Sequence, residues 1–158
     1  VTIPPEKIKF LEDHLMMFFT GFSRTASEIA HHQIQNIPKK KKELKAMHQM
    51  AVAAVDILNG NHLVEFGRLL HEAWRLKRSL SEKISTPPID ALYQKARRAG
   101  VAGGKLLGAG GGGFILLFAK PERQPHIRQA LKDLLEIPFR FESLGTQIIF
   151  YQPNSGQV

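Results

Sequence analysis

The residues of this sequence best suited to chemistry lie in a glycine-rich stretch from Gly103 to Gly113, which holds seven of the chain's 13 glycines. Glycine at so many nearby positions indicates backbone with positive φ, or an approach too close for a Cβ. The bare N–H groups of such a loop can converge and bind an anion such as a phosphate. The stretch therefore predicts a phosphate-binding loop. A tight turn that only lets two strands pack closely is the alternative.

The segments on either side indicate which kind of loop this is. The apolar run Phe114 to Ala119 follows it and has the composition of a buried strand. The pattern Gly-x-Gly-x-x-Gly from Gly108 to Gly113 matches a dinucleotide fingerprint, but that motif must open a helix. A P-loop needs Lys and Ser/Thr after its last glycine, where Phe114 and Ile115 stand. Both motifs are excluded, and the loop is expected to join two strands.

The order Gly104-Lys105-Leu106-Leu107-Gly108-Ala109-Gly110-Gly111-Gly112-Gly113-Phe114 resembles the third, C-terminal motif of the GHMP kinases, the galacto-, homoserine, mevalonate and phosphomevalonate kinase superfamily. Segments 18–27, 70–80 and 138–141 are similar to the bacterial D-glycero-D-manno-heptose 7-phosphate kinases. These members of the superfamily phosphorylate the anomeric hydroxyl of a sugar phosphate with ATP. The kinase part of fucokinases is similar more loosely.

The resemblance implies roles for particular residues. A loop facing the phosphates and the reacting sugar is implied for Gly108, Ala109, Gly110, Gly111, Gly112 and Gly113. A cation could be added there by Lys105 and by either Lys77 or Arg78. Alternatively, Lys105 is a strand residue that faces solvent. Ser23 and Arg24 are expected to hold the substrate's distal phosphate, because arginine grips such groups bidentately.

The family also implies what this chain lacks. GHMP kinases carry their ATP-phosphate loop, their acidic catalytic residue and much of their magnesium site in an N-terminal domain, and no matching stretch is found here. We therefore expect no catalytic residue in this chain, and ATP and Mg²⁺ held mainly by a missing N-terminal kinase domain. The expected ligands are ATP and a sugar phosphate. Phosphoryl transfer depends on positioning and charge neutralisation, so the chain should be inactive alone.

The element pattern predicts an α+β fold with a ferredoxin-like βαββαβ core, a mainly antiparallel sheet with helices on one face, and an inserted helical hairpin. A capping box, Thr25-x-x-Glu28, is expected to start a helix near Ala26. The remaining expectations are helices near 6–13, 44–58, 63–80, 86–99 and 121–135, strands at 15–19, 138–142 and 147–151, a domain spanning 1–151 and a frayed tail at 152–158.

The composition of the chain indicates which classes of ligand it is suited to bind. The formal net charge of +8 favours acidic ligands, and half of it comes from the run Lys39 to Lys42, expected on a solvated helix start. Nucleic-acid binding would call for a stripe of basic residues interleaved with exposed aromatics, and the sequence has no such stripe. The net charge keeps nucleic-acid binding as an alternative function. A second alternative is a ferredoxin-like ligand-binding module with no reaction. A galactokinase- or fucokinase-like sugar kinase is the third.

Cysteine is absent, which fits a reducing cytoplasm. No apolar run is long enough for a membrane helix, and no membrane contact is expected. His71-Glu72 begins like a zinc-protease motif, but Arg75 stands where the second histidine must be, so no metal site is predicted.

Overall fold

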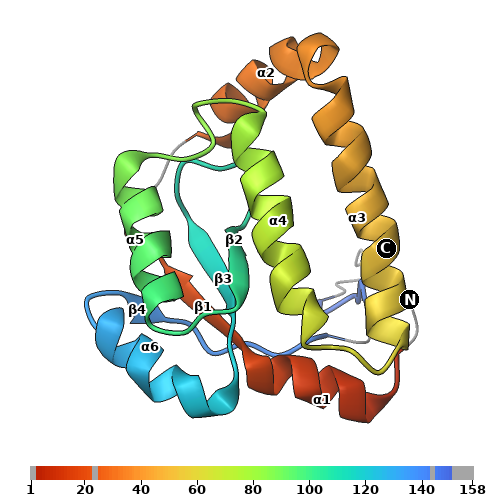
Figure 1. Ribbon diagram of the computed structural model, residues 1–158, viewed down its shortest axis with the longest axis vertical. Helices are drawn as coiled ribbons and strands as arrows, with labels where there is room; N and C mark the ends of the chain where they lie inside the picture. The colour runs from red at the N-terminus through yellow and green to blue at the C-terminus, as the bar shows by residue number, and fades with distance from the viewer. Residues whose placement is uncertain (1–2, 23–24, 143–144, 151–158) are drawn as a thin grey trace, which may run out of the picture.

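The computed structural model describes residues 3–22, 25–142 and 145–150. The elements lie in the following order along the chain: α1 (Pro5–His14), β1 (Leu15–Phe19), α2 (Ala26–Asn36), η1 (Ile37–Lys39), α3 (Lys41–Asn59), α4 (Glu65–Ser79), α5 (Pro87–Arg98), β2 (Gly103–Leu106), β3 (Phe114–Phe118), η2 (Pro121–Arg123), α6 (Gln124–Ala130) and β4 (Leu135–Glu136) (Figure 1). Within these residues, no helix is long and apolar enough to cross a membrane.

The four strands form one antiparallel sheet in the order β2-β3-β1-β4. With the helices between β1 and β2 taken as one unit, the chain runs βαββαβ, and this strand order is that of a ferredoxin-like sheet. The predicted fold class is confirmed. The inserted hairpin is also found, because α3 and α4 pack along one another and the chain turns between them at residues 60–64 (Figure 1).

One face of the sheet carries the main core. Phe18 and Ile115 lie opposite one another in β1 and β3 and are 1% and 0% exposed. They belong to a buried cluster that includes Tyr93 of α5, Ile127 of α6 and Trp74 of α4. The apolar side chains expected on the inner faces of these helices therefore meet the alternate residues of the strands. Trp74 is a core residue with 0% exposure.

The second face carries a smaller core at the end of the sheet away from the glycine loop. Leu15 of β1 and Phe118 of β3 pack there against Leu11 of α1 and Leu70 of α4. Helix α4 comes so close to β2 that a Cβ on Gly103 would lie 1.7 Å from the carbonyl oxygen of Gly67. Two glycines facing one another thus set the position of α4 against the edge of the sheet.

The capping box is not formed as predicted. Helix α2 does begin at Ala26 with Thr25 as its N-cap, but the Thr25 side chain makes no capping hydrogen bond. Glu28 is exposed and lies 3.9 Å from Lys83 instead. The ion pair with Lys83 places the Glu28 carboxylate toward solvent and the α4–α5 connection.

The predictions for the C-terminal part need correction. The helix ends at Ala130 instead of running to residue 135, and the strand lies at Leu135–Glu136 instead of 138–142. Pro138 has no N–H to continue the ladder after the Ile137 N–H bond to Met17. Residues 147–150 form no strand, and Ile149 is 94% exposed. The tail predicted at 152–158 lies outside the described residues.

Candidate functional site

The glycine loop is a hairpin connection between β2 and β3, as the sequence predicted. Positive φ angles occur at Gly108 (72°), Gly110 (123°), Gly111 (73°) and Gly113 (90°). Other residues rarely adopt this conformation, so glycine is required for the backbone course at these positions.

Two other segments of the chain hold the loop. The N–H of Gly111 donates to the carbonyl of Ile84 over 2.8 Å, and the N–H of Gly113 donates to that of Phe22 over 2.7 Å. The hydroxyl of Thr20 donates to the carbonyl of Gly113 over 2.9 Å. The loop is therefore fixed between the end of β1 and the α4–α5 connection.

These attachments leave no room for side chains at two positions. A Cβ on Gly110 would lie 2.7 Å from the carbonyl oxygen of Ile84, and one on Gly112 would lie 2.5 Å from that of Phe22. Tight packing thus explains some of the glycines, as the simple-turn alternative requires. It does not explain Gly108, where a Cβ would meet nothing within 4 Å.

Two side chains hold successive carbonyls on the outer part of the loop. The Lys77 ammonium of α4 donates to the carbonyl of Gly108, and the Gln33 amide of α2 donates to that of Ala109 over 2.8 Å. Because the peptide bonds are trans and planar, the amides of Ala109 and Gly110 point away from these donors. Within the described residues, the amides of Gly108, Ala109, Gly110 and Gly112 have no protein acceptor.

The loop borders a hollow of about 260 Å³, lined by Ala26, Leu107, Gly108, Ala109, Gly110, Gly112, Gly113 and Phe114. Unpaired backbone amides at the wall of a concave site are typical of anion binding. The loop amides are therefore divided into two sets. Those of Gly111 and Gly113 fasten the loop to the protein, and the others remain available to a ligand.

Positive charge gathers beside the loop. Burial, and then the nearby charge of Lys105, lowers the pKa of Lys77 to about 8. Two ammonium groups that disfavour one another's charge would both be stabilised by an anion between or beside them. The structure thus brings together Lys77, Lys105 and Gly108 to Gly113 of the predicted site. Arg78, the alternative to Lys77, points elsewhere and pairs with Asp90 over 2.6 Å.

Ser23 and Arg24 lie outside the described residues, so their role stays a prediction. The chain on both sides of them reaches the site, because Phe22 accepts the Gly113 N–H and Ala26 lines the hollow. Sequence reasoning missed Thr20, Gln33 and Ile84 as residues that hold the loop. No local pattern marks these residues, since they reach the loop through tertiary packing.

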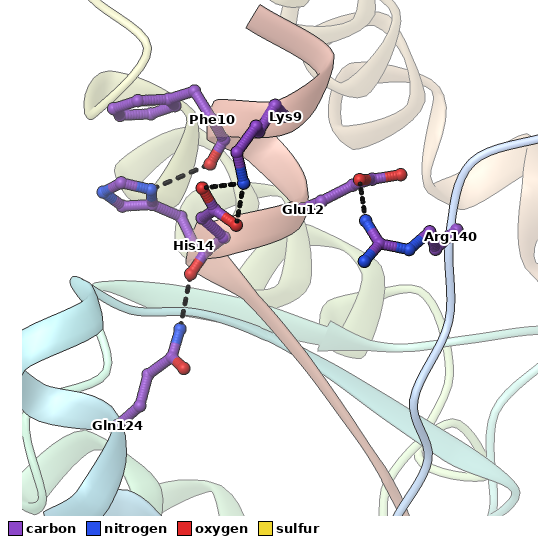
Figure 2. A network of polar contacts seen from close by, with 7 residues as sticks. Lys9, Phe10, Glu12, His14, Gln124 and Arg140 are labelled. Atoms are coloured by element: carbon purple, nitrogen blue, oxygen red, sulfur yellow. Dashed lines mark hydrogen bonds and ion pairs between the residues drawn. The ribbon is translucent and has the colours of Figure 1, made fainter. Parts of the chain in front are cut away.

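Several other polar groups of the described residues make structural contacts with one another. His71 and Tyr93 stack and share a hydrogen bond of 2.7 Å, and burial raises the pKa of Tyr93 to about 12. A larger hollow of about 740 Å³ lies between α1, α6 and residues 136–140. Its charged residues are paired, Arg140 with Glu12 (Figure 2) and Arg128 with Glu136, each over 2.8 Å. These pairs leave little for an anion, so the smaller hollow at the loop is the better candidate.

The residues at the loop suit phosphate groups better than a metal ion. Backbone amides and lysines are donors that match phosphate oxygens, whereas Mg²⁺ takes oxygen ligands such as carboxylates. In the described ranges, no group of three or more histidine, aspartate or glutamate side chains is arranged to hold a metal.

A comparison with protein families identifies the family of this chain. The model "GHMP kinases C terminal" matches residues 40–137, which is more than half of the chain. The chain therefore belongs to the GHMP kinases, through their C-terminal domain, and the resemblance inferred from the glycine loop is confirmed.

Individual relatives are kinases of several substrates. A D-glycero-alpha-D-manno-heptose 7-phosphate kinase of Campylobacter jejuni is 31% identical over 125 residues, which cover 77% of this chain and 37% of that protein. The bifunctional fucokinase/GDP-fucose pyrophosphorylase of Arabidopsis thaliana is 31% identical over 84% of this chain and 13% of its own length. The chain thus spans well under half of these relatives.

Solved structures share the fold. The mevalonate kinase of Methanococcus jannaschii superposes with a TM-score of 0.70 at 23% identity, over 87% of this chain and 42% of that one. A D-glycero-D-manno-heptose 1-phosphate kinase of Bacteroides thetaiotaomicron gives a TM-score of 0.59 at 23% identity, over 89% of this chain and 37% of that one.

Proposed function

We propose that this chain is the C-terminal half of an ATP-dependent kinase that phosphorylates the anomeric hydroxyl of D-glycero-D-manno-heptose 7-phosphate. The observation that carries the proposal is the set of unpaired loop amides at the wall of the hollow. The identity to the Campylobacter jejuni heptose 7-phosphate kinase supports the choice of substrate. A cytoplasmic setting, where ATP is available, goes with this proposal.

In this proposal the glycine loop faces the phosphoryl group in transfer. The unpaired amides of a loop that is already fixed to Ile84 and Phe22 need no reorganisation when charge develops, and such preorganisation is the main way a protein stabilises this kind of transition state. Lys77 and Lys105 reduce the cost of bringing a phosphorylated sugar to ATP.

Ser23 and Arg24 would hold the distal phosphate of the sugar. Their sequence neighbours support this role, because the Phe22 carbonyl accepts a hydrogen bond from the glycine loop and Ala26 lines the hollow. The acidic catalytic residue, the ATP-phosphate loop and much of the Mg²⁺ site would come from an N-terminal kinase domain, as membership of the GHMP kinases implies. ATP with Mg²⁺ supplies the transferred phosphoryl group.

The test uses the longer protein that carries this chain, assayed with ATP and Mg²⁺ on heptose 7-phosphate, L-fucose and mevalonate. We expect kcat/KM to be highest for heptose 7-phosphate. Arg24→Ala should raise KM for that substrate about 10- to 100-fold, because a charge-assisted grip of about 1.5–3 kcal/mol is lost, and should change KM for ATP little. Equal effects on both substrates would place Arg24 elsewhere.

A fucokinase activity is the second candidate, and the match to the Arabidopsis thaliana enzyme over 84% of this chain supports it. L-fucose carries no phosphate, so Arg24 would then have no distal anion to hold. Turnover of L-fucose that is unaffected by Arg24→Ala would favour this candidate. Saturable ligand binding without any turnover would favour a non-catalytic module instead.

A further inference from the structure

The connection between α4 and α5, residues 80–86, forms no helix or strand, yet it holds the glycine loop (Figure 1). The carbonyl of Ile84 accepts the Gly111 N–H over 2.8 Å, and Ile84 itself is 0% exposed. Gly110 also passes so close that a Cβ there would lie 2.7 Å from the same carbonyl oxygen. A displacement of Ile84 would therefore be transmitted directly to the loop.

The Asp90 carboxylate, in the first turn of α5, joins this connection to both helices that flank it. Its Oδ1 accepts a hydrogen bond of 2.6 Å from the hydroxyl of Ser85, the residue after Ile84. Its Oδ2 accepts one of 2.6 Å from the guanidinium of Arg78, in the last turn of α4. We call Arg78, Ser85 and Asp90 the Asp90 clamp.

The contacts of the Asp90 clamp are suited to fixing a geometry. Hydrogen bonds to a carboxylate are shorter and stronger than those between neutral groups. The side chains of Arg78 and Asp90 are 34% and 35% exposed, so protein shields much of the pair from water. With one partner on each oxygen, the carboxylate cannot rotate without losing a bond.

A simpler role for Asp90 would be to stabilise the start of α5. A carboxylate in the first turn of a helix interacts favourably with the helix dipole. That role requires neither the Ser85 hydroxyl nor the contact that reaches back 12 residues to Arg78. Ser85 is therefore the residue at which the two roles can be separated.

We propose that Asp90 is a positioning residue for phosphoryl transfer, and that it acts through the connection that carries Ile84. This rests on the proposed function. The Ile84 bond fixes the plane of the peptide between Gly110 and Gly111. The amides of Gly110 and Gly112, which have no acceptor among the described residues, lie on either side of that peptide in the chain. Asp90 thus sets the direction of amides that would face the phosphoryl group, without touching the substrate itself.

The first measurement is hydrogen exchange of the Gly111 amide in the 158-residue chain, followed by NMR. Ser85→Ala removes one bond to Asp90 and leaves the ion pair of Asp90 in place, so we expect Gly111 to exchange at least about fivefold faster. Ser85→Thr keeps the hydroxyl and should restore slow exchange. The matched control is Ser79→Ala, whose hydroxyl lines the same hollow of about 440 Å³ but donates to a carbonyl of α4, and it should exchange as wild type.

The second measurement is steady-state kinetics of the longer protein that carries this chain. Ser85→Ala should lower kcat about fivefold to tenfold, because one hydrogen bond that positions the loop is lost. Asp90→Ala removes both contacts and should lower kcat by up to about 100-fold. KM for ATP should stay within about twofold, since a positioning residue acts on the transition state. Ser79→Ala should behave as wild type.

Unchanged exchange of Gly111 in Ser85→Ala, or wild-type kcat in both Ser85→Ala and Asp90→Ala, would overturn the proposal. An equal increase in exchange at Gly111 and at residues 93–97 would overturn it in favour of a role in α5 alone. The exchange measurement does not depend on the sugar. Faster exchange of Gly111 in Ser85→Ala, together with a wild-type protein that does not phosphorylate heptose 7-phosphate, would remove the proposed substrate and keep Asp90 as the residue that fixes the loop.

Discussion

The side-chain amide of Gln33 donates a hydrogen bond of 2.8 Å to the carbonyl oxygen of Ala109, 76 residues further along the chain. This contact ties helix α2 to the glycine loop. Together with the Lys77 contact to Gly108, it sets the direction of the loop amides that remain unpaired.

Gln33 is therefore expected to position the loop without touching substrate. Gln33→Leu should lower kcat of the longer protein about fivefold to tenfold, since one hydrogen bond contributes about 1–1.5 kcal/mol. KM for ATP should stay within about twofold. Gln35→Leu on the exposed side of α2 is the control and should behave as wild type in the same steady-state assay. A loss of kcat in both variants would indicate a general effect on α2.

Lys77 should couple anion binding to pH. Its pKa of about 8 lies below the usual lysine value because burial and Lys105 disfavour the charged form. Between pH 8 and about 10.5 the unfolded chain then binds more protons than the folded one, so stability attributable to Lys77 rises with pH across that window. A bound anion should raise this pKa, and affinity for inorganic phosphate should fall above pH 8.

The measurement is a titration of ¹³C-labelled lysine side chains by NMR, with and without inorganic phosphate. A pKa of Lys77 that does not rise with phosphate would contradict an anion site at this position. Lys77→Met should weaken phosphate binding. Lys95→Met, at an exposed lysine of α5 near Asp133, should leave it unchanged.

Glycines of the loop should differ in their tolerance to alanine. Gly112→Ala would place a Cβ 2.5 Å from the Phe22 carbonyl and break the contact that holds Gly113. We expect kcat to fall at least about 100-fold, because a displacement near 1 Å in a positioned site has that effect. Gly108→Ala meets no atom and should cost only backbone strain, about 1 kcal/mol. Equal activity of the two folded variants would favour the simple-turn interpretation. Gly111→Val, at a φ of 73°, should resemble Gly112→Ala.

The contact between α4 and β2 should dominate stability near the sheet edge. Gly103→Ala would bring a Cβ within 1.7 Å of the Gly67 carbonyl oxygen and force the helix away. Overpacking of this kind costs about 3 kcal/mol or more. Urea unfolding of the 158-residue chain measures it. Gly145→Ala, at a positive φ with no atom within 4 Å, is the control and should cost about 1 kcal/mol.

Short-range patterns in the sequence account for much of the fold. The apolar runs that became β1 and β3, and the 3.6-residue periodicity of α3 and α4, depend on local spacing. Burial follows this spacing in β1, β3 and α4, whereas α3 has no fully buried residue. The segment around Pro138 shows where such local patterns fail to predict the structure. The alternation around it is typical of a strand, but Glu12, far away in sequence, holds Arg140 and the Phe141 N–H beside α1 instead.

The candidate site also has residues that the sequence could predict and residues that it could not. Gly108 to Gly113 and Lys105 could be predicted, because a loop motif is contiguous in sequence. The contacts of Gln33, Thr20 and Ile84 with the loop could not, because each joins segments brought together only by the packed fold. Their side chains and carbonyls carry no local signal of that role.

The central claim is that the glycine loop forms one wall of a phosphoryl-transfer cleft and that another domain forms the other wall. The most direct test is ATP-dependent phosphorylation of heptose 7-phosphate by residues 1–158 alone and by the longer protein. We predict no transfer above background from the 158-residue chain, and turnover by the longer protein that Gly112→Ala removes. Turnover by the 158-residue chain alone at an ordinary kinase rate, about 1–100 s⁻¹, would contradict the claim.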